Sequence, residues 1–367
     1  AQKACSYSHP MQFGRLITRV PRPIDSTAAA DAAAYVADHG PDIRALLGGT
    51  AGCSPFLASL IRRENAWLNE ALHDIDAALD RTFAFVAETP EDAPRRLRAA
   101  KRRVALLTAL ADLGGVWPLE KVTATLTRLA DAACQTALEE ALRLNIRRGQ
   151  MPALHEETTL AEAGLVIFAM GKMGAGELNY SSDIDLIVLF DPNRFDRADF
   201  AAMRAGFVAT MRRVTATLSD MTADGYVFRT DLRLRPDPSV TPIVVSMDAA
   251  ERYYESLGRT WERAAWIKAR PCAGDLAAGE RFLQALSPFV WRRHLDFAAI
   301  EDAHNMRLAI RDHKGGHGPI TLPGHDLKLG RGGIREIEFF TQTRQLISGG
   351  RAPDLRVRGT VDGLVRL

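Results

Sequence analysis

Residues 171–185 read Gly171-Lys-Met-Gly-Ala-Gly-Glu-Leu-Asn-Tyr-Ser-Ser-Asp183-Ile-Asp185, a glycine-rich turn that leads into two carboxylates one residue apart. The segments on either side, 165–170 and 184–190, are apolar runs without a helical period, which is typical of buried strands. If the two aspartates open the second strand, its alternation places both side chains on one face, roughly 7 Å apart at Cα. Both carboxylates are then within reach of one divalent ion.

A cation is the natural partner for this pair of acids. Two unpaired carboxylates at the edge of an apolar strand repel each other and lose hydration, which is costly. Hard oxygen ligands favour Mg²⁺ or Mn²⁺ over zinc, so we predict a metal site with Mg²⁺ as its cofactor and Mn²⁺ as the alternative. A purely structural turn, in which Asp183 is a cap and Asp185 is incidental, stays open.

Other glycine or acid motifs fit the segment poorly. A P-loop has its lysine after the glycines, whereas Lys172 precedes Gly174 and Gly176. A dinucleotide-binding turn has a different glycine spacing and an acidic residue about twenty positions further on. An EF-hand loop alternates acids with polar residues, whereas an apolar strand follows here.

A third carboxylate, Asp231, lies in the segment 226–236, Tyr-Val-Phe-Arg-Thr-Asp-Leu-Arg-Leu-Arg-Pro. Large or apolar residues alternate there with polar ones, so we predict a half-buried strand. Arg229, Arg233 and Arg235 stand at period-two positions and share the face of the aspartate. One acid in a row of arginines indicates a phosphate-handling surface; a surface strand whose charges pair locally is the alternative.

Phosphate contacts are also predicted around the glycine turn. The backbone amides of residues 174–177 can form an anion-binding nest, and the two serines before Asp183 can donate hydrogen bonds to phosphate oxygens. Serines beside an aspartate also cap turns, and the lysine of the turn suits a phosphate contact and plain exposure equally. The candidates for phosphate or nucleotide contact here are Gly174, Gly176, Ser181, Ser182 and Lys172.

The segment 328–338, Lys-Leu-Gly-Arg-Gly-Gly-Ile-Arg-Glu-Ile-Glu, precedes an apolar-periodic run and predicts the start of a helix. Glycines ahead of a helix expose free amides at the positive end of the dipole, which favours an anion. Glu336 and Glu338 diverge on a helix, which argues against a shared metal, although one of them can orient an arginine. A plain helix start with solvated charges stays open. The predicted cationic contacts are Lys328, Arg331 and Arg335.

Residues 200–221 repeat large apolar side chains at intervals of three and four and predict an amphipathic helix that packs on the sheet. Strand, glycine turn, strand with Asp-x-Asp, helix and strand with one Asp is the order of the DNA polymerase beta type of nucleotidyltransferase core. We predict an α+β, mostly helical fold in which helical bundles flank this core. Four motifs, at 171–187, 228–236, 261–270 and 328–339, together resemble the bifunctional glutamine synthetase adenylyltransferase/adenylyl-removing enzyme family.

The resemblance runs from about residue 54 to the end and matches the N-terminal, adenylyl-removing half of that family. It implies phosphorolysis, in which phosphate attacks the α-phosphorus of adenylyl-tyrosine and releases ADP and unmodified glutamine synthetase. It also implies that Asp183, Asp185 and Asp231 are the catalytic residues and metal ligands. Three positions, Met173, Ala175 and His294, depart from the family pattern, and none of them removes a carboxylate.

The resemblance further implies the partners. They are adenylylated glutamine synthetase, a PII signalling protein, phosphate with ADP or ATP, and a C-terminal adenylyltransferase half of the same polypeptide. We therefore expect the chain to be a fragment of a longer protein.

The composition is that of a globular enzyme. With 367 residues, 47% of them hydrophobic, the chain can bury a large core. A net charge of +2 gives no strong steering toward nucleic acid, and four scattered cysteines indicate reduced thiols without a zinc site. No apolar stretch approaches membrane-spanning length, so we expect a soluble, cytoplasmic protein that does not bind membranes.

We predict three regions along the chain. Residues 1–155 form an N-terminal helical region, with partial disorder up to about residue 40 and a helix that starts at Ser54 and Pro55. Residues 156–246 form the nucleotidyltransferase core, and residues 247–367 form a C-terminal helical subdomain. We predict that the basic cluster 95–103 is a solvated helix face. We also predict that the aromatic residues around Tyr254 and Trp266 pack in the core rather than stack on an adenine.

Three functions fit this pattern. The first is an adenylyl-removing phosphorylase, and the second is an ATP-dependent adenylyltransferase that uses the same carboxylates in the opposite direction. The third is a non-catalytic module that binds glutamine synthetase or PII. A pure binding module has no need of three acids, and the helical leader favours removal over addition.

Overall fold

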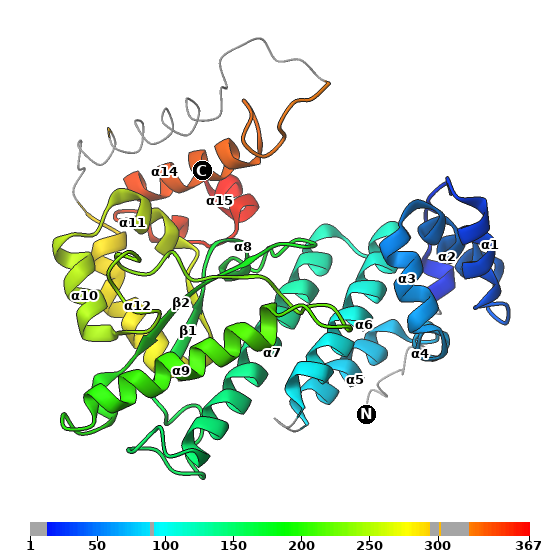
Figure 1. The fold of residues 1–367 in the computed structure, drawn as a ribbon. Helices are drawn as coiled ribbons and strands as arrows, with labels where there is room; N and C mark the ends of the chain where they lie inside the picture. The colour runs from blue at the N-terminus through cyan, green and yellow to red at the C-terminus, as the bar shows by residue number, and fades with distance from the viewer. Residues whose placement is uncertain (1–12, 89–91, 294–300, 302–322) are drawn as a thin grey trace, which may run out of the picture. The chain divides into compact units, whose positions relative to one another are not determined.

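The computed structural model describes residues 13–88, 92–293, 301 and 323–367 (Figure 1). By their internal contacts the residues form two compact units: a helical unit of 1–136, 179–181 and 220–227, and a sheet unit of 137–178, 182–219 and 228–367. The division into three regions at 155 and 246 stays a prediction. Part of the predicted C-terminal helical subdomain, residues 294–300 and 302–322, lies outside the described residues, as does Cys5.

The helical unit consists of helices, and its ordered structure begins nearer the N-terminus than predicted. Ser54 accepts a hydrogen bond from the amide of Leu57 at 3.3 Å and Pro55 opens the following helix, which confirms the predicted start. The expected partial disorder is wrong from residue 13 onward, because the leader packs closely: a Cβ at Gly49 would lie 2.2 Å from the carbonyl oxygen of Pro21. The elements are η1 (Phe13–Leu16), α1 (Ser26–Ala34), α2 (Pro41–Cys53), α3 (Pro55–Arg63), α4 (Asn65–Ala71), α5 (Ile75–Ala87), α6 (Ala93–Leu113) and the first part of α7 (Leu119–Arg147).

The basic cluster 95–103 lies on α6 and is not a solvated face. Arg98 is only 3% exposed, and it donates hydrogen bonds to the backbone carbonyls of Gly225 at 2.7 Å and Asp220 at 2.6 Å. Two further arginines of the cluster pair with the buried carboxylate of Glu64. The prediction was wrong because a distant loop of the chain covers this face of the helix.

A mixed sheet forms the centre of the sheet unit. Its order is β3-β2-β1-β5, and β4 also pairs with β2. β1 is antiparallel to β2 and to β5, whereas β3 and β4 are parallel to β2. Both predicted buried strands are confirmed, and the combination of helices with a small sheet confirms the predicted fold class. The strands are β1 (Leu165–Ala169), β2 (Ile184–Phe190), β3 (Thr230–Asp231), β4 (Val245–Ser246) and β5 (Arg270–Gly274).

One face of the sheet is covered by α9 (Phe200–Ser219). The rings of Phe190, at the end of β2, and Phe207, on the helix, lie 5.4 Å apart between centroids. The predicted amphipathic helix is therefore confirmed, except that it ends at Ser219 and leaves Met221 exposed.

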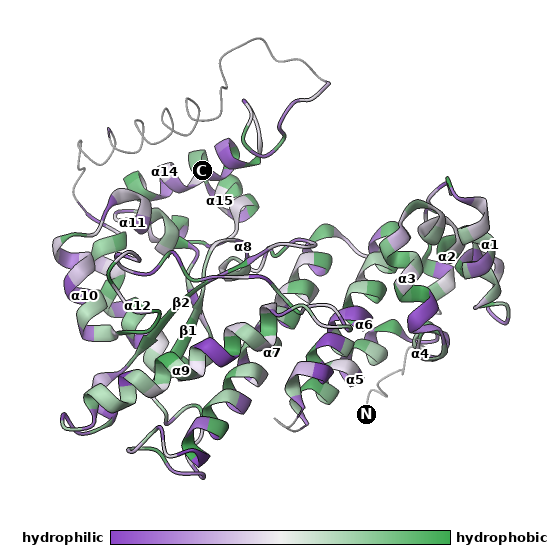
Figure 2. Ribbon diagram, in the orientation of Figure 1, coloured by the Kyte–Doolittle hydropathy of each residue, from purple (hydrophilic) through white to green (hydrophobic). Residues whose placement is uncertain are grey.

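The residues that alternate with Phe190 along β2 point into a second core, formed with α10 (Met247–Ser256), α11 (Thr260–Ile267) and α12 (Leu276–Val290). The strands β1 and β2 are accordingly hydrophobic in Figure 2. Tyr254 and Trp266 are 1% and 4% exposed and pack edge to face, which confirms core packing rather than an adenine stack.

The remaining elements surround this framework. They are α8 (Gly171–Gly174), η2 (Pro192–Arg194), α14 (Ile334–Ser348), η3 (Pro353–Leu355) and α15 (Thr360–Arg366). None of the helices in the described part of the chain is both long and apolar enough to cross a membrane.

Candidate carboxylate site

The sheet register brings the candidate carboxylates together. β2 and β3 are parallel, and Asp185 is the register partner of Asp231. Asp183 lies one residue before β2 begins, and the amide of Met170 at the end of β1 donates to the carbonyl of Asp185 at 2.9 Å. Asp185 and Asp231 therefore lie side by side on two strands, with Asp183 just ahead of β2, at the edge where β1 passes into the glycine turn.

Asp185 is the acid that most needs a cation. Its side chain is half-buried, and burial together with the charges of Asp231 and Asp183 raises its pKa, while Arg335 and Arg233 act in the opposite direction. Within the described residues, no group donates a hydrogen bond to this carboxylate. A desolvated acid beside two like charges is stabilised by a bound cation or by a proton.

Gly171 gives the turn its close approach to Asp185. Its φ is +53°, and a Cβ at this position would lie 3.1 Å from the Oδ2 of Asp185. A side chain here would be strained and would press on the carboxylate, so both the conformation and the contact require glycine.

The other two acids are paired with arginines. Arg229 Nε donates to Asp183 Oδ1, and Arg233 makes a forked contact with Asp231, with Nε 2.9 Å from Oδ2. The bonds from Arg233 lower the pKa of Asp231. The side chain of Arg233 is nevertheless 83% exposed, so the pair lies at the surface and is weak enough to exchange partners.

The residues fit a divalent cation in chemistry but do not enclose one. Over the described residues, no three His, Cys, Asp or Glu side chains are arranged to hold a metal ion. In this structure Arg229 and Arg233 are bonded to two of the three carboxylates. The three carboxylates offer only oxygen donors, which suits Mg²⁺ or Mn²⁺, and no cationic side chain in the described residues is bonded to Asp185. The metal itself stays a prediction.

The predicted strand 226–236 is wrong except at Thr230 and Asp231. β3 contains only two residues, and the chain then turns through Pro236 and Asp237, whose φ is +38°. Arg235 is consequently not on the face of Asp231, because its guanidinium donates to the carbonyls of Leu232, Pro238 and Thr241. Its contact with phosphate stays a prediction. Alternation alone could not show that the chain leaves the sheet directly after Asp231 and turns from Arg233 onward.

The predicted nest of amides in the glycine turn is also wrong in this conformation. All four amides of residues 174–177 donate to carbonyls within the turn or at its start. Gly174 has a packing role, because a Cβ there would lie 2.1 Å from the carbonyl oxygen of Lys268. Lys172 and Ser182 are half-exposed and Ser181 belongs to the helical unit, so their phosphate contacts stay predictions, as does that of Gly176.

The second glycine-rich segment leads into α14, which confirms the predicted helix start. Its amides are occupied, since Arg335 N donates to the carbonyl of Lys328 at 3.0 Å and Gly332 N donates to Glu336 Oε2 at 2.8 Å. The predicted anion site on free amides is therefore wrong. Of the cationic candidates, Arg335 acts on Asp185, while contacts of the exposed Lys328 and Arg331 with phosphate stay predictions.

A buried ion cluster near this site was not predicted. Lys268, whose side chain is 4% exposed, places its Nζ 3.1 Å from Glu338 Oε1 and 3.5 Å from Glu177 Oε2. It also donates to Thr360 Oγ1 at 2.9 Å. Each of the three charged residues lies inside one of the four sequence motifs. That was the only sequence feature that could have pointed to the cluster.

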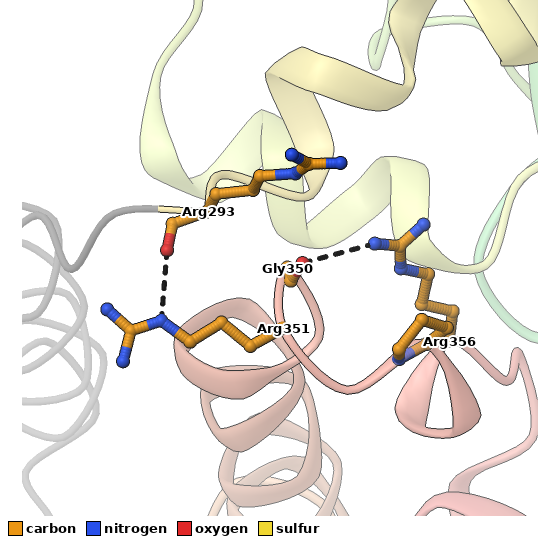
Figure 3. Close-up of a pocket in the computed structure, with 5 residues that line it drawn as sticks. Arg293, Gly350, Arg351 and Arg356 are labelled. Carbon is orange, nitrogen blue, oxygen red and sulfur yellow. Dashed lines mark hydrogen bonds between the residues drawn. The ribbon is translucent and has the colours of Figure 1, made fainter.

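A surface cavity of about 600 Å³ lies at the opposite end of α14 from Arg335 (Figure 3). Two arginines that line it donate hydrogen bonds to backbone carbonyls. Arg356 donates to the carbonyls of Gly349 and Gly350, and Arg351 donates to that of Arg293. The cavity is separate from the carboxylates and has the character of a capped helix end.

Comparison with known proteins establishes the class. A family model described as glutamate-ammonia ligase adenylyltransferase matches residues 45–285, and one described as GlnD PII-uridylyltransferase matches residues 304–365. The first match covers most of the chain, including all three carboxylates. The chain belongs to the glutamate-ammonia ligase adenylyltransferase family, a family of nucleotidyltransferases.

Curated relatives agree with this assignment. A Bradyrhizobium protein (strain BTAi1) is 49% identical over 93% of the chain and 35% of its own length. A Caulobacter vibrioides protein is 49% identical over 86% of the chain and 32% of its length, and one from Rhodopseudomonas palustris (strain TIE-1) is 47% identical over 91% and 34%. Each is named a bifunctional glutamine synthetase adenylyltransferase/adenylyl-removing enzyme. The chain spans about a third of the length of these relatives, and the family resemblance seen in its motifs is confirmed.

Proposed function

We propose that this chain removes AMP from an adenylylated tyrosine of glutamine synthetase by phosphorolysis, and so reactivates the synthetase in nitrogen regulation. The names of the relatives include adenylyl removal as well as addition. The observation that carries the proposal is the meeting of Asp185 and Asp231 in register beside Asp183. The removal direction rests on the resemblance of the motifs to the N-terminal half of the family.

The reaction exchanges one bond at phosphorus for another. An oxygen of inorganic phosphate forms a bond to the phosphorus of AMP, while the bond from that phosphorus to the tyrosine oxygen breaks. The products are ADP and a phenolate, which takes up a proton from water. Phosphate is already ionised near pH 7, so the attack needs little help from a base, but the phenol has an ordinary pKa of about 10 and leaves only with stabilisation.

The carboxylates Asp183, Asp185 and Asp231 would hold the metal. When bound, Mg²⁺ would neutralise charge that develops on the phosphoryl oxygens. Arg229 and Arg233, which now pair with two of these acids, have exposed guanidinium forks suited to binding phosphate oxygens once the acids are occupied. The same arginines thus keep the acids paired in the absence of ligand and bind the phosphoryl group in its presence.

The proposal extends to partners and place. It includes a PII signalling protein as regulator, ADP or ATP as the nucleotide, a C-terminal adenylyltransferase half in the longer polypeptide, and a cytoplasmic location. These elements rest on the family, whose relatives are about three times as long as this chain.

The test follows ADP release from adenylylated glutamine synthetase in the presence of Mg²⁺ and phosphate. Release by the wild-type chain should depend on phosphate and on metal. It should be lost in Asp183→Asn and kept in Asp196→Asn, a control at an exposed aspartate of the same unit. Incorporation of AMP from ATP into unmodified synthetase would instead assign the opposite direction, and silence in both assays would favour a binding module.

A further inference from the structure

We infer that Lys268 is a positioning residue that holds the glycine turn and α14 in place on either side of Asp185. The inference rests on the proposed function for its kinetic test, and it names a residue outside the carboxylate site. Three of the four motifs contribute charged side chains to this one buried contact: Glu177 from the first, Lys268 from the third and Glu338 from the fourth.

The contact joins the two segments through both charge and hydrogen bonds. Glu177 accepts the amide of Thr360 through Oε1 at 2.7 Å, and its Oε2 lies 3.5 Å from Lys268 Nζ. Nζ reaches Glu338 at 3.1 Å on the other side. The start of α15 is thereby drawn into the same cluster, and a single ammonium bridges two carboxylates from distant parts of the chain.

The backbone around Lys268 also supports the turn. Its carbonyl lies where a Cβ of Gly174 would be, at 2.1 Å, so the turn packs directly against it. Two residues later, Arg270 donates to the carbonyl of Met173 at 3.1 Å. The turn is thus held against this segment at both its backbone and its acidic end.

Both elements that Lys268 ties down affect Asp185, the turn through a close contact and α14 through the charge of Arg335. The turn begins at Gly171, whose Cβ position is 3.1 Å from Asp185 Oδ2. α14 carries Arg335, whose charge acts on Asp185, one turn of helix before Glu338. Without the ammonium, the two partly buried carboxylates of the cluster would repel each other and push the two elements apart. The predicted consequence is a displaced catalytic edge in a chain that is still folded.

The kinetic test uses Lys268→Met, which keeps the length of the side chain and removes its charge. The rate of ADP release per enzyme (kcat) should fall about 100-fold, as for misplacements of about 1 Å, while KM for adenylylated glutamine synthetase stays within about twofold. Lys268→Arg should recover a large part of the rate. Leu286→Ala, a cavity variant in the core of the same unit, is the control for general destabilisation and should keep its kcat below its melting temperature.

A double variant separates position from stability. Adding Glu338→Gln to Lys268→Met removes one unpaired buried charge and should restore much of the melting temperature, but it does not restore the tether, so kcat should stay low. Recovery of kcat together with stability would overturn the inference. So would a kcat of Lys268→Met within threefold of wild type, or an equal loss in Leu286→Ala.

A readout without activity keeps the inference distinct from the proposed function. Amide hydrogen exchange in residues 175–177 and 336–338 should become at least tenfold faster in Lys268→Met and stay near wild type in Leu286→Ala. If the wild-type chain releases no ADP, the proposed function fails, while the exchange result still decides the role of Lys268. Unchanged exchange in both segments would refute it.

Discussion

Replacing Gly171 with alanine tests the geometry around Asp185. The residue has φ +53°, and this left-handed conformation costs an alanine about 1–2 kcal/mol. The smaller entropy of the unfolded variant offsets roughly 0.4–1 kcal/mol of that cost, which leaves a net loss near 1 kcal/mol. The new Cβ would also lie 3.1 Å from Asp185 Oδ2, so the carboxylate must shift by a few tenths of an ångström.

Gly149→Ala is the matched control for strain. Gly149 has φ +66°, and no atom lies within 4 Å of its Cβ position. Both variants should lower the melting temperature by about 2–4 °C, because both carry a similar backbone cost. Only Gly171→Ala disturbs a candidate ligand, and it should weaken Mn²⁺ binding about tenfold, as losses of ligand support commonly do. Calorimetry measures the first quantity, and titration followed by electron paramagnetic resonance measures the second.

Equal Mn²⁺ affinity in the two variants would refute this reasoning. It would mean either that Asp185 is not a ligand or that its carboxylate moves aside without cost. A much larger loss of stability in Gly171→Ala than in Gly149→Ala, with unchanged Mn²⁺ affinity, would assign the close contact a packing role alone.

Three further outcomes are expected. Asp185→Asn should weaken Mn²⁺ binding more than about tenfold, while the exposed control Asp196→Asn leaves it unchanged in the same titration. Arg235→Lys should cost about 2 kcal/mol in urea unfolding, because an ammonium cannot replace a fork that donates to three carbonyls. Burial raises the pKa of Glu262 above its ordinary 4.5, so the folded chain binds that proton more tightly than the unfolded chain and loses stability as pH rises from 4.5 through the folded pKa. Glu262→Gln should flatten that decline in unfolding curves recorded from pH 4 to 8, and an unchanged slope would contradict the assignment.

Local patterns predicted the elements that a single stretch of sequence determines. The apolar runs at 165–170 and 184–190 are strands because nothing within them favours another structure, and residues 200–219 form the helix that their spacing requires. The placement of Asp185 at the start of a buried strand followed from the same reading. These features depend on neighbours within one element, so no tertiary information was needed.

The errors share a different cause. Free amides were predicted at residues 174–177 and at the start of α14, but polar groups of the backbone seldom stay unpaired, and local carbonyls or a nearby glutamate bind them. Arg98 and Arg235 were read as charges on exposed faces, whereas loops fold over the first and around the second. Apart from Glu336, the partners are backbone carbonyls, which every residue carries and which a side-chain pattern therefore cannot reveal.

The cluster at Lys268 shows that motifs far apart in the sequence can contribute charged residues to one contact. Its acidic partners are 91 and 70 residues away in the chain, so no spacing rule could connect them. Lys268 is only 3% exposed, so its ammonium loses its hydration, and this cost is offset only if carboxylates lie beside it. The carboxylates that pair with it are held in position by the same contact. The cost of burying this charge therefore constrains the glycine turn and α14 at once, and these are the elements that affect Asp185. A substitution at any of the three charged residues should disturb an acid that none of them touches.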